Sequence, residues 1–168
     1  MKRLILFRHA KTERTSASGE DFDRALTERG KADAALTGRL LRAAGLIPDR
    51  VLVSGAKRTQ ETWTAAGDNL PDAHAKVLDD LYDAPSTRLY AAAKAEPDAN
   101  TVMVIAHNPG VQSLALELAD HATLIDAEVK AKLAEGFPTA AAIVFEFEEN
   151  RTGCLGLFLP SEHGGGAG

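Results

Sequence analysis

Residues 3–10 read RLILFRHA, and this stretch, with two counterparts further along the chain, decides the fold. Leu4 to Phe7 form a short continuous apolar run, which is typical of a strand buried on both faces of a sheet. Arg8 and His9 follow the run directly. The same pattern recurs where residues 51–53 precede the polar stretch 54–58, and where residues 102–106 precede His107.

The remaining sequence alternates helical and strand patterns, which predicts an α/β domain. Thr27 is a suitable N-cap for a helix that extends to Ala44, with Ala32, Ala35, Leu36, Leu40 and Ala43 on its apolar face. Gly45 then supplies the stop. Further helices are expected at 56–66, 86–95, 109–119 and 127–135, and strands at 3–7, 49–54, 75–78, 101–106, 141–147 and 155–159. The last two strands are expected to pair around residues 150–153 and to include an antiparallel member.

The chain has 168 residues, which suits a single domain over residues 1–160 with a flexible glycine-rich tail at 161–168. Its net charge of −5 disfavours nucleic-acid binding, which requires a basic face. The apolar run near the N-terminus is shorter than a signal peptide requires, and no stretch approaches the length that spans a bilayer. We therefore expect no membrane partner and a cytoplasmic location.

Three polar groups lie at the carboxyl ends of predicted strands: Arg8 with His9, residues 54–58, and His107. Ligands of open α/β sheets bind in the crevice beyond these ends, so one shared site is expected there. Lys57 and Arg58 fall in the first turn of a helix, where the helix dipole disfavours cations. A bound anion such as phosphate would explain their position, whereas the alternative is a solvated pair of surface cations.

The residue types at this edge suit phosphoryl transfer. The planar fork of Arg8 can grip a phosphate, although an ion pair with Asp23 is the alternative. Two histidines without an acidic ligand motif make a weak metal site, and the single Cys154 adds no cysteine cluster, so we expect neither metal nor cofactor. Histidine can act as a nucleophile, with cations stabilising the transferred group. The other histidines, His74, His121 and His163, have polar contexts typical of surface positions.

These segments resemble the histidine phosphatase superfamily, over residues 3 to about 147. The matching stretches are LFRHA at 6–10, DRALTERG at 23–30, VSGAKRTQET at 53–62 and IAHNPG at 105–110. The stretch FPTA at 137–140 resembles the SixA-type phosphohistidine phosphatase branch. The motifs are short, but their order and spacing together make the match specific.

The resemblance implies a phosphoglycerate-mutase-like fold: a three-layer sandwich with a mostly parallel sheet and helices on both faces. It also implies roles for four residues: His9 is the phosphorylated nucleophile, Arg8 and Arg58 grip the phosphoryl oxygens, and His107 donates a hydrogen bond to the transferred group. Ala10 departs from the glycine of the commonest signature, and it would be strained if the backbone needed a positive φ there.

The general acid is less defined. Asp80 is the candidate, with Asp83 behind it, although both could be loop acids or helix caps. SixA-type relatives often lack a clear acid, which is chemically reasonable because an imidazole leaving group is far less basic than an alkoxide.

The expected activity is removal of phosphate from phosphohistidine on a signalling or phosphotransfer protein. Residues 54–106 leave little room for a deep lid, and an open site suits a protein substrate and water as the final acceptor. A phosphatase for a small phosphorylated metabolite is the alternative, since it would use the same residues. An inert phosphate-binding module is a third possibility, which the presence of His9 disfavours.

Overall fold

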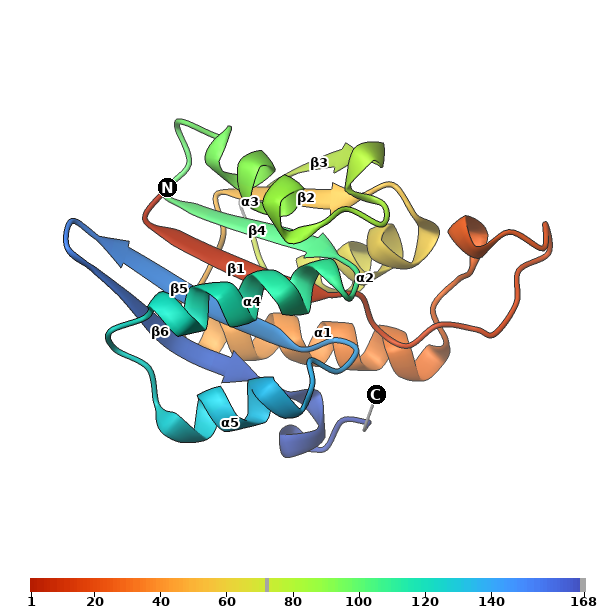
Figure 1. Cartoon of the computed structure of the whole chain (residues 1–168). Coiled ribbons are helices and arrows are strands. Elements are labelled where there is room, and N and C mark those ends of the chain that lie inside the picture. The colour runs from red at the N-terminus through yellow and green to blue at the C-terminus, as the bar shows by residue number, and fades with distance from the viewer. Residues whose placement is uncertain (72, 167–168) are drawn as a thin grey trace.

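The computed structural model describes residues 1–71 and 73–166. Within these residues, six strands form one sheet in the order β3-β2-β4-β1-β5-β6 (Figure 1). Strands β1 to β4 run parallel, whereas β5 pairs antiparallel with both β1 and β6. The strands are β1 Arg3–Arg8, β2 Arg50–Ser54, β3 His74–Leu78, β4 Thr101–Ala106, β5 Ala142–Glu148 and β6 Arg151–Phe158.

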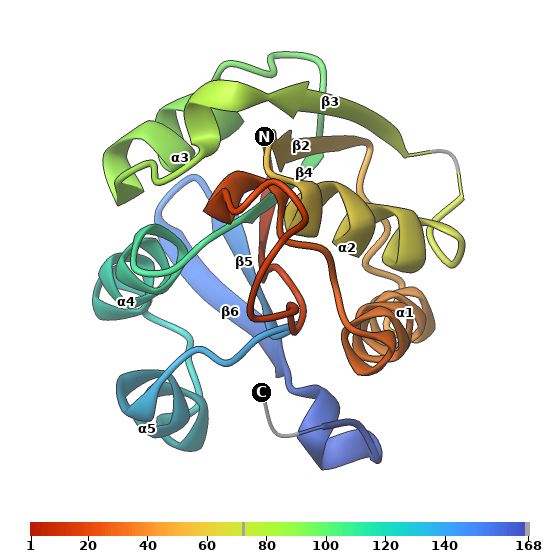
Figure 2. The ribbon, with the colours of Figure 1, turned by 90° about the vertical axis from the view of Figure 1, so that its right-hand side faces the viewer.

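Helices cover both faces of the sheet, as Figure 2 shows. On one face lie α1 Glu28–Ala43 and α2 Lys57–Gly67. On the other face lie α3 Ser86–Lys94, α4 Gly110–His121 and α5 Ala127–Glu135. The predicted three-layer α/β sandwich with a mostly parallel sheet is therefore confirmed.

Each face of the sheet has its own apolar core, and β1 contributes to both. Leu4 and Leu6 pack in the core beneath α3, α4 and α5, whereas Ile5 and Phe7 pack in the core beneath α1 and α2. Successive strand residues point to opposite faces, so a continuous apolar run is what a sheet covered on both sides requires.

The predicted bounds of α1 are close to those observed, but its predicted buried face is wrong. Thr27 caps the helix by accepting a hydrogen bond from the Gly30 amide, and Gly45 follows the helix with a φ of 71°. Ala32 and Ala43 are exposed. The buried positions are Gly30, Asp33, Ala34, Thr37, Gly38 and Leu41.

Close packing of α1 against α2 explains this difference. A Cβ added at Gly38 would lie 2.5 Å from the carbonyl oxygen of Ala66 in α2. The two backbones therefore approach too closely for large side chains, and small residues form the contact. The predicted face was chosen by the spacing of alanine and leucine, and this spacing carries no information about how closely α2 approaches.

The hairpin of β5 and β6 has a shorter turn than predicted. Strand β6 begins at Arg151, which pairs with Glu148, and Gly153 pairs with Glu146 within the ladder. The turn consists of residues 149 and 150. Gly153 was assigned to the turn because glycine is typical of turns, but here it is a strand residue.

The segment expected to be a tail begins inside the 3-10 helix Pro160–His163. Beyond it, the Gly166 amide donates a hydrogen bond of 3.0 Å to the Asp33 carboxylate of α1. The last two tail residues lie outside the described residues. No helix in the described part of the chain has both the length and the apolar character needed to cross a membrane.

Candidate active site

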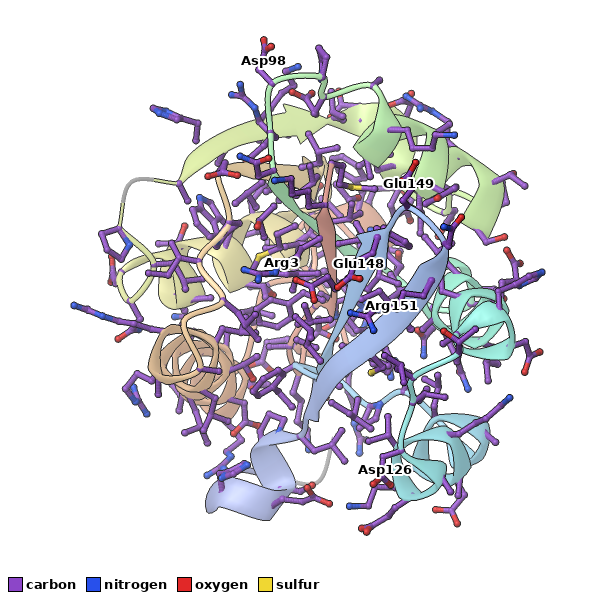
Figure 3. The ribbon with its side chains drawn as sticks, turned by 90° about the vertical axis from the view of Figure 1, so that its left-hand side faces the viewer. Arg3, Asp98, Asp126, Glu148, Glu149 and Arg151 are labelled. Atoms are coloured by element: carbon purple, nitrogen blue, oxygen red, sulfur yellow. The ribbon has the colours of Figure 1, made fainter. Side chains whose placement is uncertain are left out.

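The strand order brings the three polar segments together. Strands β2, β4 and β1 are neighbours in the sheet, and their carboxyl ends carry residues 54–58, His107 and His9, respectively. The segment between β1 and α1, which includes the 3-10 helix Asp21–Asp23, lies across this end of the sheet (Figure 2). The opposite end carries the charged side chains of Arg3, Glu148 and Arg151 (Figure 3).

His9 is held as a neutral imidazole with a defined tautomer. Its Nδ1 lies 2.8 Å from the carbonyl oxygen of Ala10, and because a carbonyl can only accept, Nδ1 must carry the proton. Burial lowers the pKa of His9 to about 3, and the nearby charges of His107, Arg58 and Arg8 lower it further, against the raising effect of the Ala10 hydrogen bond. The other ring nitrogen, Nε2, therefore has a free lone pair at neutral pH.

His107 lies beside His9, with 5.3 Å between the two ring centroids. Its Nε2 is 2.7 Å from the Ser54 hydroxyl at the end of β2, and its Nδ1 is buried without a hydrogen-bond partner among the described residues. Burial, with the charge of Arg58 as the next cause, lowers the pKa of His107 to about 4. The unpartnered Nδ1 can donate to a ligand if Ser54 donates to Nε2.

Arg58 is buried in the first turn of α2, whereas Lys57 beside it is exposed. The guanidinium donates hydrogen bonds to the carbonyl and the carboxylate of Asp21, at 2.8 and 3.0 Å. It also lies over the Tyr82 ring, 5.7 Å from the centroid. The alternative of a solvated surface cation therefore fits Lys57 but not Arg58.

Asp21 is a site residue that sequence reasoning missed. Its carboxylate accepts hydrogen bonds from Arg58 and, at 2.6 Å, from the Tyr82 hydroxyl. The hydrogen bond from Tyr82 is the largest cause that lowers the pKa of Asp21, to about 2. The carbonyl and the carboxylate of Asp21 thus occupy the two Nη atoms of an arginine that could otherwise bind a phosphoryl group. The only sequence signal was an acid in a polar loop, which is typical of many solvated residues.

Arg8 follows β1 and is half-buried. Its Nη1 donates to the carbonyl oxygen of Phe137 at 2.9 Å, and its Nε is buried without a partner among the described residues. The alternative ion pair with Asp23 is not formed in the structure, where the Asp23 carboxylate accepts a hydrogen bond from Ser18. Ala10 is fully buried and is not among the described residues with positive φ, so its backbone does not require glycine.

The structure does not bring Asp80 into contact with His9, His107, Arg8 or Arg58. Its exposed carboxylate is bound by Arg88 of α3. Asp83 is exposed, with a φ of 54°. The residue of this segment that reaches the site is Tyr82, whose ring lies edge-on to His107 at a centroid distance of 5.5 Å. A proton-donor role for Asp80 stays a prediction.

In the described part of the chain, no three histidine, cysteine, aspartate or glutamate side chains are grouped so that they could hold a metal ion. His74, His121 and His163 are exposed, in agreement with the surface positions predicted for them.

Comparison with known proteins places this geometry in a family. Residues 4–85 match the profile of the histidine phosphatase superfamily (branch 1). An uncharacterized protein of Mycobacterium tuberculosis (strain H37Rv) is 33% identical over 155 residues, which is 89% of this chain and 95% of that protein. An uncharacterized chloroplastic protein of Arabidopsis thaliana is 32% identical over 129 residues, 70% of this chain. The match covers 59% of that longer protein.

Solved structures agree with the sequence matches. A structure assigned as phosphohistidine phosphatase SixA from Agrobacterium tumefaciens superimposes with a TM-score of 0.83 at 27% identity, covering 95% of this chain and 98% of that one. The protein histidine phosphatase SixA complexed with tungstate gives a TM-score of 0.72 at 25% identity, covering 96% and 99%. The chain therefore belongs to the histidine phosphatase superfamily and is a hydrolase of its SixA type.

Proposed function

We propose that this enzyme removes phosphate from phosphohistidine on a protein, through a phosphorylated intermediate on His9. The observation that carries the proposal is the pair of neutral imidazoles, with ring centroids 5.3 Å apart, beside the guanidinium groups of Arg8 and Arg58. A phosphoryl group in transfer carries negative charge on its equatorial oxygens, so cations fixed around a nucleophile stabilise it.

In the first step, the Nε2 lone pair of His9 attacks phosphorus, a bond from Nε2 to phosphorus forms, and the phosphorus–nitrogen bond of the substrate breaks. The other ring nitrogen of the substrate histidine carries a proton, so the leaving group keeps the bonding electron pair and departs as a neutral imidazole. Because this leaving group has an unperturbed pKa near 6.5, it needs far less help from a proton donor than an alkoxide does. The binding of the Asp80 carboxylate by Arg88, away from His9, is compatible with this chemistry.

In the second step, water attacks the phosphorus atom on His9, and the bond from phosphorus to Nε2 breaks. Inorganic phosphate leaves, and His9 returns to its neutral form. Through Nδ1, His107 donates a hydrogen bond to the transferred group, provided that Ser54 donates to the other ring nitrogen. The Ala10 carbonyl keeps the His9 proton on Nδ1 throughout, so Nε2 is the reactive nitrogen in both steps.

Two observations support this choice of substrate. Residues 55–100 are taken up by α2, β3, α3 and their connections, so this segment provides no deep lid over the site. The related SixA structure holds tungstate, which is a tetrahedral oxyanion like phosphate. A protein-borne phosphoryl group would reach the site past the segment between β1 and α1, which lies across this end of the sheet.

The test compares wild-type enzyme with His9→Ala and with His74→Ala, which makes the same change at an exposed histidine of β3. The substrates are a protein phosphorylated on histidine and a panel of phosphomonoesters. We expect wild-type and His74→Ala enzyme to release phosphate from phosphohistidine, and His9→Ala to be inactive while its circular dichroism is unchanged. An alkaline quench during turnover should trap phosphate on wild-type enzyme but not on His9→Ala.

Faster turnover of a small ester than of phosphohistidine would instead favour a metabolite phosphatase. Full activity of His9→Ala would exclude His9 as the nucleophile.

A further inference from the structure

A cavity of about 570 Å³ adjoins the phosphate-binding groups on the side of α4 and α5. Arg8 and Asn108 line it. Arg8 directly precedes His9 in the chain, and Asn108 directly follows His107. The cavity lies within the size range of ligand pockets and is far larger than a phosphoryl group. None of the catalytic steps described above uses it.

One backbone carbonyl connects the cavity with the site. Phe137, which lines the cavity, accepts hydrogen bonds through its carbonyl oxygen from Arg8 Nη1 at 2.9 Å and from Asn108 Nδ2 at 3.0 Å. Arg8 therefore lies between the cavity and the phosphate site. A phosphoryl group held by Arg8 would leave the part of the substrate attached to it within reach of this cavity.

The residues that line the cavity include an acid whose charge is not neutralised by a described residue. Glu135 is exposed at the last position of α5, where the helix dipole disfavours negative charge. It makes no ion pair and no side-chain hydrogen bond with any described residue. Lys132, a cation of α5 that also lines the cavity, is already bound by Glu128 at 2.9 Å and by Glu162.

We infer that this cavity receives the segment of the protein substrate next to the phosphohistidine, and that Glu135 binds a basic side chain of that segment. The inference rests on the proposed function, because it assigns the recognition of that substrate. An acid placed against the helix dipole and without a cation in the protein itself is explained when the substrate supplies the cation. Glu135 is thus a specificity-determining residue, and Arg8 binds the phosphoryl group beside it.

The experiment uses phosphohistidine peptides that carry either lysine or glutamine at successive positions on either side of the phosphohistidine. We expect wild-type enzyme to favour the lysine peptide in kcat/KM at one or two of these positions, by about three- to fivefold, as an exposed ion pair would give. Glu135→Lys should remove or invert this preference, and Glu135→Gln should reduce it.

The matched control is Glu149→Lys. Glu149 is exposed at the hairpin turn on the opposite end of the molecule (Figure 3), and its substitution makes the same change in net charge. This variant should keep both the activity and the lysine preference of wild-type enzyme. Loss of the preference in Glu149→Lys as well would mean that overall charge, and not the cavity, sets it.

A steric variant tests the cavity independently of charge. A Cβ added at Gly136, which also lines the cavity, would have no atom within 4 Å. Gly136→Leu should therefore lower peptide turnover relative to that of p-nitrophenyl phosphate, which fills only the phosphoryl site. If wild-type enzyme hydrolyses no phosphohistidine peptide, the proposed function fails. If it hydrolyses them all equally, and Glu135→Lys does too, only the inference about the cavity fails.

Discussion

The Arg58 guanidinium contributes the buried positive charge of the site, since its side chain is only 5% exposed. Arg58→Ala should lower kcat by roughly a hundredfold to a thousandfold, which corresponds to about 3–4 kcal/mol of lost transition-state stabilisation. Steady-state kinetics on phosphohistidine would measure the loss. Lys57→Ala is the control, because Lys57 is the exposed neighbour in the same helical turn. Equal losses in the two variants would contradict a special role for Arg58.

Removing the charge of Asp21 should strengthen anion binding, whereas removing Arg58 weakens it, because the Asp21 carboxylate competes with the phosphoryl group for Arg58. Asp21→Asn removes the competing charge and should tighten the binding of inorganic phosphate or tungstate by about two- to fivefold, the size expected for a half-exposed ion pair. Inhibition constants for the two anions would show the change. Weaker binding in this variant would mean that Asp21 orients Arg58 for the anion instead.

The low pKa values of His9 and His107 make stability depend on pH. Both rings are neutral when folded, with pKa values of about 3 and 4, but bind protons below about 6.5 when unfolded. The unfolded state therefore gains protons first on acidification, and the free energy of unfolding falls, by about 2 kcal/mol per ring between pH 7 and pH 5.

This pH dependence can be measured by urea unfolding at the two pH values. His9→Gln should show a smaller loss of stability than wild-type enzyme, since glutamine does not titrate. His74→Gln, at an exposed position, should show the wild-type loss. An unchanged loss in His9→Gln would contradict a buried neutral His9.

The positions of His9, His107 and Arg58 could be predicted because the two histidines follow recognisable strands directly, and Arg58 lies in the first turn of the helix after β2. Asp21 and Tyr82 could not, because they meet Arg58 through contacts between segments far apart in the chain. Asp80 was predicted as the candidate general acid, with Asp83 behind it, and the sequence does not show that Arg88 binds Asp80.

At the level of the elements, one side of α2 binds the segment between β1 and α1 through hydrogen bonds. Arg58, Glu61 and Thr62, at spacings that place them on the same side of a helix, bond to this segment. Arg58 binds Asp21, Glu61 accepts from the Leu26 amide at 2.7 Å, and Thr62 accepts from the Ala10 amide at 3.0 Å. One helix thus fixes both ends of the segment and its middle.

Thr62→Val should remove the hydrogen bond that holds Ala10, the residue after His9. The substitution leaves the buried Ala10 amide without an acceptor, which costs about 1–3 kcal/mol of stability, and kcat should fall because the backbone after His9 is no longer held. Thr64→Val is the control on the same helix, since the exposed Thr64 side chain bonds to the Gln60 carbonyl of its own helix. Denaturant unfolding and kcat measured on both variants would test this. Equal effects would contradict the role of the Ala10 contact.

The elements were largely predictable, whereas their packing was not. Helix α1 has a clear N-cap at Thr27 and a clear stop at Gly45, so its bounds follow from local chemistry. Its buried face depends on how closely α2 approaches Gly38, which is a property of two helices together. The glycines of β6 misled the hairpin assignment for a similar reason, because strand pairing overrides their local preference.

For the molecule as a whole, the two cores share one sheet and should unfold together. Leu89 belongs to the core beneath α3 and α4, and Leu41 to the core beneath α1 and α2. Trp63, the single tryptophan, lies in α2. Leu89→Ala should lower stability by about 2–5 kcal/mol and shift the Trp63 fluorescence transition, although the substitution lies on the far face.

Leu41→Ala, on the same face as Trp63, is the companion variant. Both variants should show coincident unfolding transitions by tryptophan fluorescence and by far-ultraviolet circular dichroism. A fluorescence midpoint that is unmoved in Leu89→Ala would mean that the two faces unfold independently.

Strand β4 lies between β1 and β2, although it follows both of them in the chain. While the polypeptide emerges from the ribosome, His9 and Arg58 are therefore synthesised well before the strand that joins their two strands side by side. The groups that grip a phosphoryl oxygen remain apart until translation has passed residue 107. A chain whose synthesis stops before residue 107 therefore carries the nucleophile without its pocket.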